Sequence, residues 1–103
     1  MLEDAIFSDL YNYILGHVGY AKYRASNVFT RVEINDITLH TNGPVRVTIG
    51  IIPQEPCVID RVEIYSTQDQ LWACQDCNIS VAADQTGVLY WFDFYVEEAA
   101  SNE

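Results

Sequence analysis

The hydrophobic positions of the chain change their spacing near residue 28, from a helical period to a strand-like period. In residues 2–15 apolar side chains recur at every fourth position, which predicts an amphipathic helix. The members of this stripe are Leu2, Ile6, Leu10 and Ile14. Glu3 and Asp4 suit the positive end of the helix dipole, and Gly16 can supply a left-handed C-cap. A helix of this length is marginal alone, so we expect its apolar stripe to pack on the rest of the chain.

Beyond residue 28 the apolar residues recur at every second position, which is the period of a half-buried strand. The runs are VFTRVEI (28–34), ITL (37–39), VRVTIGII (45–52), CVIDRVEIYS (57–66), LWAC (71–74), NISVAA (78–83) and VLYWFDFYVEE (88–98). Turn signals separate them, including Asn42-Gly43 and the loop DQTG. The alternation changes phase at Asn35-Asp36, which predicts a bulge or a strand break.

The same alternation predicts which side chains face the interior. We expect three inner faces to carry Val45, Val47, Ile49 and Ile51; Val58, Val62 and Ile64; and Val88, Tyr90, Phe92, Phe94 and Val96. Residues 88–92 are apolar on both faces, which is typical of a strand covered on two sides.

Six or seven short strands with frequent turn signals predict a mainly β protein, an antiparallel β-sandwich with one N-terminal helix. An α+β arrangement, with the helix packed on a single antiparallel sheet, is the alternative. The two-sided apolarity of residues 88–92 favours two layers. We expect a single domain over residues 1–103, with the helix in 1–16, a β-rich body in 28–97 and a polar tail in 98–103.

The charge of the chain restricts its partners. Of the 103 residues, 15 are acidic and five are Lys or Arg, for a formal net charge of −10. A surface with this charge repels phosphate backbones, so we expect no nucleic-acid partner. No apolar run approaches the roughly 20 residues that span a bilayer, so we expect no membrane partner.

The N-terminal residues and the cysteines indicate the compartment. MLEDAIFSDL carries acids where a signal peptide has a basic region. Three cysteines without such a signal favour reduced thiols. We therefore expect a cytoplasmic or virion protein that is not secreted through a signal peptide.

Cys74 and Cys77 have the C-x-x-C spacing of zinc knuckles and redox pairs. Cys57 and His40 would complete four zinc ligands, but the second knuckle is missing, and three prolines and a strand separate these two residues. A redox pair favours a helix N-terminus, whereas the flanks here are strand-like. We expect no metal and no cofactor, and place both thiols at a turn between short strands.

The chain offers no catalytic constellation. It has no nucleophile elbow, P-loop, dinucleotide-binding glycine pattern or H-E-x-x-H. The paired acids Glu97-Glu98 precede a polar tail and are expected to be solvated. We therefore expect no enzyme and no catalytic residues.

Aromatic residues near the end of the predicted helix are the better functional clue, because Tyr and Arg are enriched at protein interfaces. Besides a role in the core and its rim, they could form a surface that binds a partner protein or another copy of the chain. The expected contact residues are Tyr20, Lys22, Tyr23 and Arg24, followed by Trp91 and Tyr95 on the second face of the last strand.

The segment RVEIYSTQDQLWACQDCNISVAADQTGVLYWFDFYV, residues 61–96, runs from a strand through a polar turn and a hairpin to a G-x-x-Y-x-F-x-F strand. This pattern is similar to small β-sandwich modules in virion proteins of tailed phages, such as baseplate, tail and head-decoration components. The predicted helix lies outside this segment, and the C-x-x-C within it is not part of the resembling pattern. It implies a non-enzymatic assembly role through oligomeric contacts, without a cofactor.

Three hypotheses follow from these observations. The first is a structural or assembly module that is a homo-oligomer or part of a larger assembly, such as a phage virion. The second is an acidic inhibitor, or nucleic-acid mimic, that binds a host protein with a row of carboxylates. The third is a small zinc-stabilised module.

Overall fold

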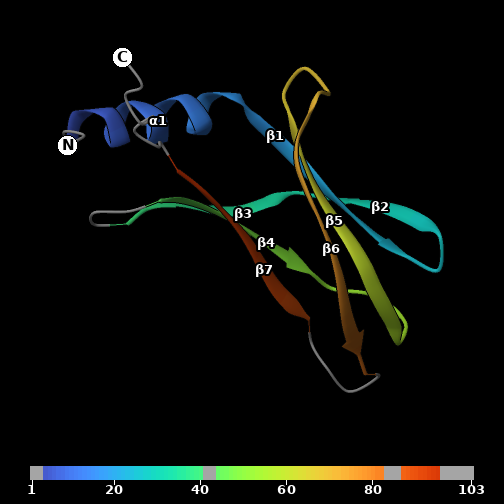
Figure 1. Ribbon diagram of the computed structural model, residues 1–103. Coiled ribbons are helices and arrows are strands. Elements are labelled where there is room, and N and C mark those ends of the chain that lie inside the picture. Colours follow the sequence, from blue (N-terminus) through green and yellow to red (C-terminus); the bar gives the residue numbers. More distant parts are fainter. Residues whose placement is uncertain (1–3, 41–43, 83–86, 96–103) are drawn as a thin grey trace, which may run out of the picture.

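The chain folds into one helix and seven strands that form two antiparallel sheets (Figure 1). The computed structural model describes residues 4–40, 44–82 and 87–95. Its elements are α1 (Asp4–His17), β1 (Val18–Ala25), β2 (Val28–Val32), β3 (Ile34–Leu39), β4 (Val45–Ile51), β5 (Cys57–Ser66), β6 (Leu71–Val81) and β7 (Val88–Phe94). The predicted mainly β, two-layer fold with an N-terminal helix is confirmed, and the single-sheet alternative is wrong.

The chain passes from one sheet to the other three times. The four-stranded sheet has the order β2-β1-β5-β6, and the three-stranded sheet has the order β3-β4-β7. The hairpins β1–β2, β3–β4 and β5–β6 each stay within one sheet, so the chain crosses over after β2, β4 and β6. The last crossover makes β6 and β7, which are consecutive in sequence, edge strands of different sheets (Figure 1).

The sequence interpretation missed β1, which is a central strand of the larger sheet. Its alternation is obscured because its inner face uses the small residue Ala21 beside Tyr23, while its outer face carries Tyr20, Lys22 and Arg24. The β-rich body therefore starts at Val18 rather than at residue 28. A two-residue turn with positive φ at both positions, Ser26 and Asn27, joins β1 to β2, as expected for a tight hairpin.

The helix continues into β1 without a loop. Gly16 remains helical and does not adopt the left-handed conformation, so the predicted C-cap is wrong. Instead, His17 Nδ1 lies 2.8 Å from the carbonyl oxygen of Tyr13, and Thr67 N–H donates to the carbonyl of His17 at 2.8 Å. Ile14 anchors the predicted stripe in the core at 2% exposure.

The stripe is less complete towards the start of the helix. Leu10 packs against the core, whereas Ile6 is 38% exposed and Leu2 lies outside the described residues. With 14 residues α1 is shorter than a bilayer requires, and the described residues contain no helix suited to cross a membrane.

Strand registers confirm most of the predicted inner faces. The register shift between Ile34 and Asp36 is the predicted bulge. The β4 series and the described β7 series face the core as expected, and in β4 all four side chains are completely buried: Val45, Val47, Ile49 and Ile51. In β5 the prediction fails at Val58, which is 47% exposed while Ile59 is buried. A register shift between Ile59 and Arg61 changes the alternation there.

Several expected features lie outside the described residues. They are the Asn42-Gly43 turn, most of the DQTG loop, Val96 at the end of the last strand, the Glu97-Glu98 pair and the tail 98–103.

Gly19 is a position where the fold excludes a side chain, and this yields a first prediction. A Cβ there would lie 2.6 Å from the carbonyl oxygen of Ser66, at the irregularity where β1 meets β5. We expect Gly19→Ala to lower the free energy of unfolding by roughly 2 kcal/mol, because the two strand backbones must separate.

Gly16→Ala is the matched control for this measurement. A Cβ at Gly16 meets nothing within 4 Å, so this helical substitution should stabilise the protein by about 0.5–1 kcal/mol. Urea unfolding of both variants tests the pair, and equal stability of Gly19→Ala and the parent would contradict the close approach of β1 and β5.

Candidate interaction surfaces

The outer face of the four-stranded sheet carries four of the five basic residues of the chain. Strand pairing places Lys22 opposite both Arg31 and Glu63, and Arg24 opposite Arg61. We call this surface the charged face; it is formed by Tyr20, Lys22, Arg24, Phe29, Arg31, Asp60, Arg61, Glu63, Tyr65 and Asp76. Sequence alone does not reveal it, because Arg61 is distant along the chain from the other cations.

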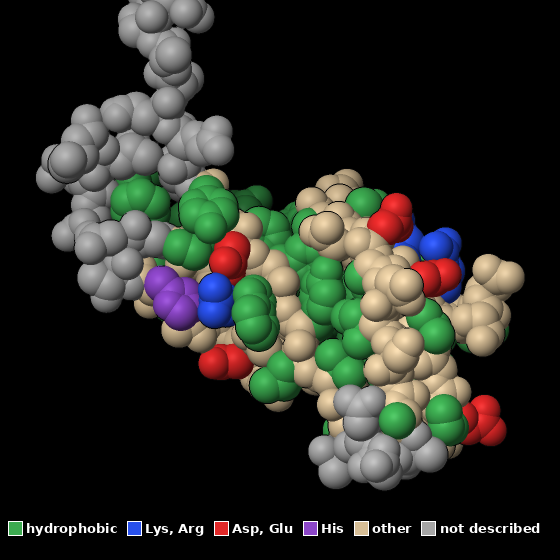
Figure 2. All heavy atoms as spheres, turned by 60° about the horizontal axis from the view of Figure 1, so that its bottom comes forward, with side chains coloured by type: hydrophobic (Ala, Val, Ile, Leu, Met, Phe, Trp, Pro, Cys, Tyr) green, Lys and Arg blue, Asp and Glu red, His purple; other side chains and the backbone are tan. Residues whose placement is uncertain are grey.

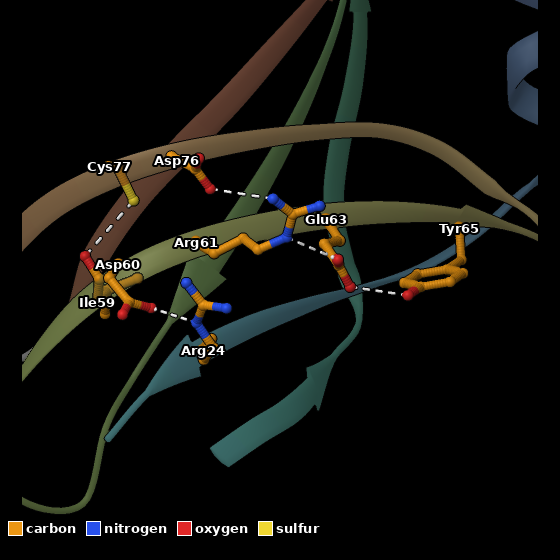
Figure 3. Close-up of polar contacts among 8 residues, drawn as sticks. All are labelled: Arg24, Ile59, Asp60, Arg61, Glu63, Tyr65, Asp76 and Cys77. Carbon is orange, nitrogen blue, oxygen red and sulfur yellow. Dashed lines mark hydrogen bonds and ion pairs between the residues drawn. The ribbon is translucent and has the colours of Figure 1, made fainter. Parts of the chain in front are cut away.

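Arginine–carboxylate pairs link the strands of the charged face (Figure 3). Arg24 Nε donates to Asp60 at 2.7 Å. Arg61 holds two acids, Glu63 through Nε at 2.9 Å and Asp76 through a terminal nitrogen at 3.0 Å. These bonds connect three neighbouring strands, so the arginine charges are largely compensated within the chain.

Aromatic rings fill the spaces between these charges. Tyr20 and Tyr65 stack with their centroids 5.2 Å apart. The Arg31 guanidinium lies 4.0 Å from the Tyr20 ring centroid, and the Lys22 ammonium lies 4.9 Å from that of Tyr65. The Tyr20 hydroxyl donates to Asp69 at 2.8 Å. Tyr20 is therefore only 8% exposed, although it points away from the core.

The first predicted contact patch is divided between two faces. Tyr20, Lys22 and Arg24 lie together on the charged face, whereas Tyr23 points to the opposite side and is part of the hydrophobic core. Tyr20 is covered by its neighbours and Arg24 is paired with Asp60. The three residues on the charged face therefore make contacts within the chain, and the Lys22 ammonium lies over the ring of Tyr65.

Of the second predicted pair, Trp91 lies on the outer face of the three-stranded sheet and Tyr95 follows directly after β7; both are exposed. Trp91 is 50% and Tyr95 63% exposed, and Leu89 on the same side of β7 is 64% exposed. We call these three residues the β7 stripe. Sequence reasoning missed Leu89, although it belongs to the same alternating series as Trp91.

An ion pair orders the middle of the β7 stripe. Arg46, opposite Asp93 in the β4–β7 register, donates to both carboxylate oxygens at 2.8 and 3.1 Å. Its guanidinium also lies 4.7 Å from the centroid of the Trp91 ring. The Trp91 ring is therefore supported by the Arg46 guanidinium, and the single acid of β7 is neutralised by its neighbour.

The C-x-x-C lies within a continuous strand rather than at a turn, so that prediction is wrong. β6 runs through both thiols, and Cys74 is exposed on the outer side. Cys77 packs against the core, and its Sγ lies 3.5 Å from the carbonyl oxygen of Ile59. Residues three apart in a strand point to opposite faces, which prevents the two thiols from sharing a ligand.

The other two candidate zinc ligands, Cys57 and His40, do not form a metal site with Cys74 and Cys77. Cys57 lies at the start of β5 and packs against the core, while His40 follows β3 in the other sheet. His40 Nε2 is buried and lacks a hydrogen-bond partner among the described residues. Within these residues no three His, Cys, Asp or Glu side chains form a group that could hold a metal ion.

Two carboxylates and a tyrosine have shifted pKa values. Burial of Glu63 acts to raise its pKa, but hydrogen bonds from Arg61 and Tyr65 outweigh burial and lower it. The hydrogen bonds from Arg46 lower the pKa of Asp93. The bond to Glu63 raises the pKa of Tyr65 to about 12. Both acids are thus stabilised in their charged form.

Comparisons of the chain with protein-family models, with curated proteins and with solved structures give no match in any of the three.

The positions of the thiols predict their reactivity. Cys74 is exposed, whereas burial raises the pKa of the Cys77 thiol and reduces its reactive thiolate. With a chromogenic aromatic disulfide we expect Cys74 to react at least about tenfold faster than Cys77 in the native protein. Cys74→Ser should remove the fast phase. Equal rates in Cys74→Ser and Cys77→Ser would contradict the placement of the two thiols on opposite faces.

The lowered pKa values predict a loss of stability in acid. Groups whose pKa is depressed in the folded state stabilise it above their unfolded pKa, and this contribution disappears as the pH falls through the folded value. For Glu63 and Asp93 the window lies from about pH 5 downward. Urea midpoints measured from pH 6 to pH 3 should therefore decrease, and Glu63→Gln should flatten the decrease. Asp9→Asn, on the exposed side of α1, controls for the loss of one charge; an equal flattening there would contradict this assignment.

Proposed function

We propose that the protein is a non-enzymatic assembly module that binds a partner protein, or another copy of itself, through the β7 stripe. The observation that carries this proposal is the exposure of Leu89 and Trp91 on one face of β7 and of Tyr95 directly after the strand. Tryptophan and tyrosine are the residues most often responsible for binding energy in interfaces. Single exposed apolar residues are common, but an aligned stripe with two aromatic rings supports a contact surface.

The charge distribution favours the β7 stripe over the charged face. A partner on the charged face would have to displace water from arginines that already have carboxylate partners. Because removing this water costs free energy and the arginines gain few new contacts, the net binding energy would be small. On the β7 stripe Arg46 is paired with Asp93 and stacked on Trp91 before binding. Because Trp91 is already ordered, less conformational entropy is lost when a partner covers it.

The carboxylates support a non-enzymatic role. A general acid or base that works near neutral pH needs a carboxyl pKa raised towards 7, and the pKa values of Glu63 and Asp93 are shifted in the opposite direction. Their oxygens bind arginine and tyrosine side chains, so these acids stabilise the sheets.

The pattern of acids also favours assembly over nucleic-acid mimicry. A mimic presents uninterrupted carboxylates, whereas Asp60, Glu63 and Asp76 alternate with arginines that neutralise them. The resemblance to phage virion modules also implies an assembly role through oligomeric contacts, and membership of such a particle is part of this proposal.

The proposal predicts the effect of removing the aromatic anchors. Trp91→Ala combined with Tyr95→Ala should weaken association by about 2 kcal/mol or more, roughly 30-fold, without changing the fold. Sedimentation velocity measures self-association, and affinity capture with the tagged chain measures binding of other components. Circular dichroism melts verify folding.

Phe29→Ala provides the matched control, because Phe29 is an aromatic residue of similar exposure, 45%, on the charged face. It should leave association unchanged. Loss of association in Phe29→Ala but not in the double variant would overturn the assignment of the contact to the β7 stripe.

A further inference from the structure

We infer that β7 pairs antiparallel with β7 of a second copy, about a two-fold axis that passes through Trp91. The pairing would join two three-stranded sheets into one continuous sheet. This inference deepens the proposed function and rests on it, because it identifies the partner of the β7 stripe as the same chain.

β7 is an edge strand without the features that normally protect edges. It pairs with β4 on one side in a regular register over all its residues, from Val88 to Phe94, and with no other strand of the described chain. Natural edges are blunted by bulges, charges, prolines or short length. The straight and largely apolar β7 has only one charged residue, Asp93.

The other three edges are each protected. β3 contains the bulge between Ile34 and Asp36, and β2 has only five residues, including the exposed Arg31. β6 is longer, but it carries two register shifts against β5 and has Asp76 at its centre. Strand addition is therefore least hindered at β7.

The inner side of β7 is incompletely covered. Its core-facing residues are half-buried, whereas the neighbouring β4 residues of the same layer are completely buried; the half-buried set is Val88, Tyr90, Phe92 and Phe94. Figure 2 shows hydrophobic side chains at the surface across the middle of the face that it presents. A strand added beside β7 would cover the inner residues and extend the outer stripe at the same time.

A register centred on Trp91 pairs apolar or aromatic side chains with one another at every position except Leu89 and Asp93. It sets Val88 opposite Phe94, Leu89 opposite Asp93, Tyr90 opposite Phe92, and Trp91 opposite Trp91 of the second copy. Cross-strand aromatic pairs of this kind stabilise antiparallel sheets. This register also pairs every residue of the strand.

Charge permits self-pairing at β7 in a chain with a net charge of −10. In the centred register the two copies of Asp93 are four residues apart along the ladder, about 14 Å, which exceeds the Debye length of about 8 Å at physiological ionic strength. Each is also neutralised by its own Arg46. The same operation on β6 would place Asp76 opposite Asp76, where like charges repel. This local neutrality supports a second copy as the occupant of the β7 edge.

Disulfide trapping tests both the contact and its register. In a background where all three cysteines are replaced by alanine, Trp91→Cys places the two new thiols opposite each other, with Cα atoms about 4.5–5.5 Å apart. Mild oxidation should accumulate a covalent dimer, because the disulfide traps the weakened contact that remains without the Trp91 ring. Leu89→Cys in the same background is the matched control, because its two copies would be about 14 Å apart, too far to bridge.

Sedimentation velocity of the parent chain should show a reversible dimer. Trp91→Glu, which places two acids on the two-fold axis, should weaken it about tenfold or more while retaining the parent's circular dichroism spectrum. A parent chain that stays monomeric up to about 0.1 mM would overturn the inference. Efficient crosslinking of Leu89→Cys would overturn it as well. A third outcome separates the two proposals. If the parent chain is monomeric but captures a different protein, and the Trp91→Ala, Tyr95→Ala variant loses that capture, the β7–β7 pairing is wrong and the proposed function stands.

Discussion

The burial of β-branched side chains between β4 and β5 is the constraint on which the rest of this structure depends. The largest fully buried side chains all come from these two strands, one in each sheet: Val45, Val47, Ile49, Ile51, Ile59, Val62 and Ile64. Branched aliphatic side chains have restricted rotamers and pack densely on a pleated surface. Each sheet is thus held by a strand that has neighbours on both sides, and the edge strands are free to carry polar or exposed residues. Both candidate surfaces lie on the outer sides of these sheets.

The side chains on the outer faces of the two sheets differ in how far their neighbours cover them. On the charged face, cations, carboxylates and rings satisfy one another across neighbouring strands, so that even Tyr20 is covered. These contacts stabilise the four-stranded sheet. On the other sheet the ion pair between Arg46 and Asp93 supports Trp91 but leaves half of it exposed. Exposed aromatic surface therefore accumulates beside an unprotected strand edge, and both proposals, partner binding and strand addition, place their contacts at β7.

The cysteines illustrate how strand geometry decides chemistry. The C-x-x-C spacing brings two thiols together in a knuckle or at a helix N-terminus. In an extended strand the same spacing sends Cys74 outward and leaves Cys77 against the core. The pair therefore differs in accessibility and in pKa, and the chemistry suggested by the motif does not arise.

The sequence alone determined the features that depend on local periodicity. The helix, the inner face of β4, the alternation of β7 and the bulge near Asp36 follow from spacing, because the period of a side-chain pattern is a property of the local backbone. The tertiary structure decided what depends on strand register. It showed that residues 18–25 form a central strand, that Tyr23 faces inward, and that Arg61 joins the cations of β1. Register is set by contacts between distant segments, and a shift such as that at Ile59 reverses which residues are buried. Whether Trp91 and Tyr95 are exposed was likewise decided only when the neighbours of β7 were known.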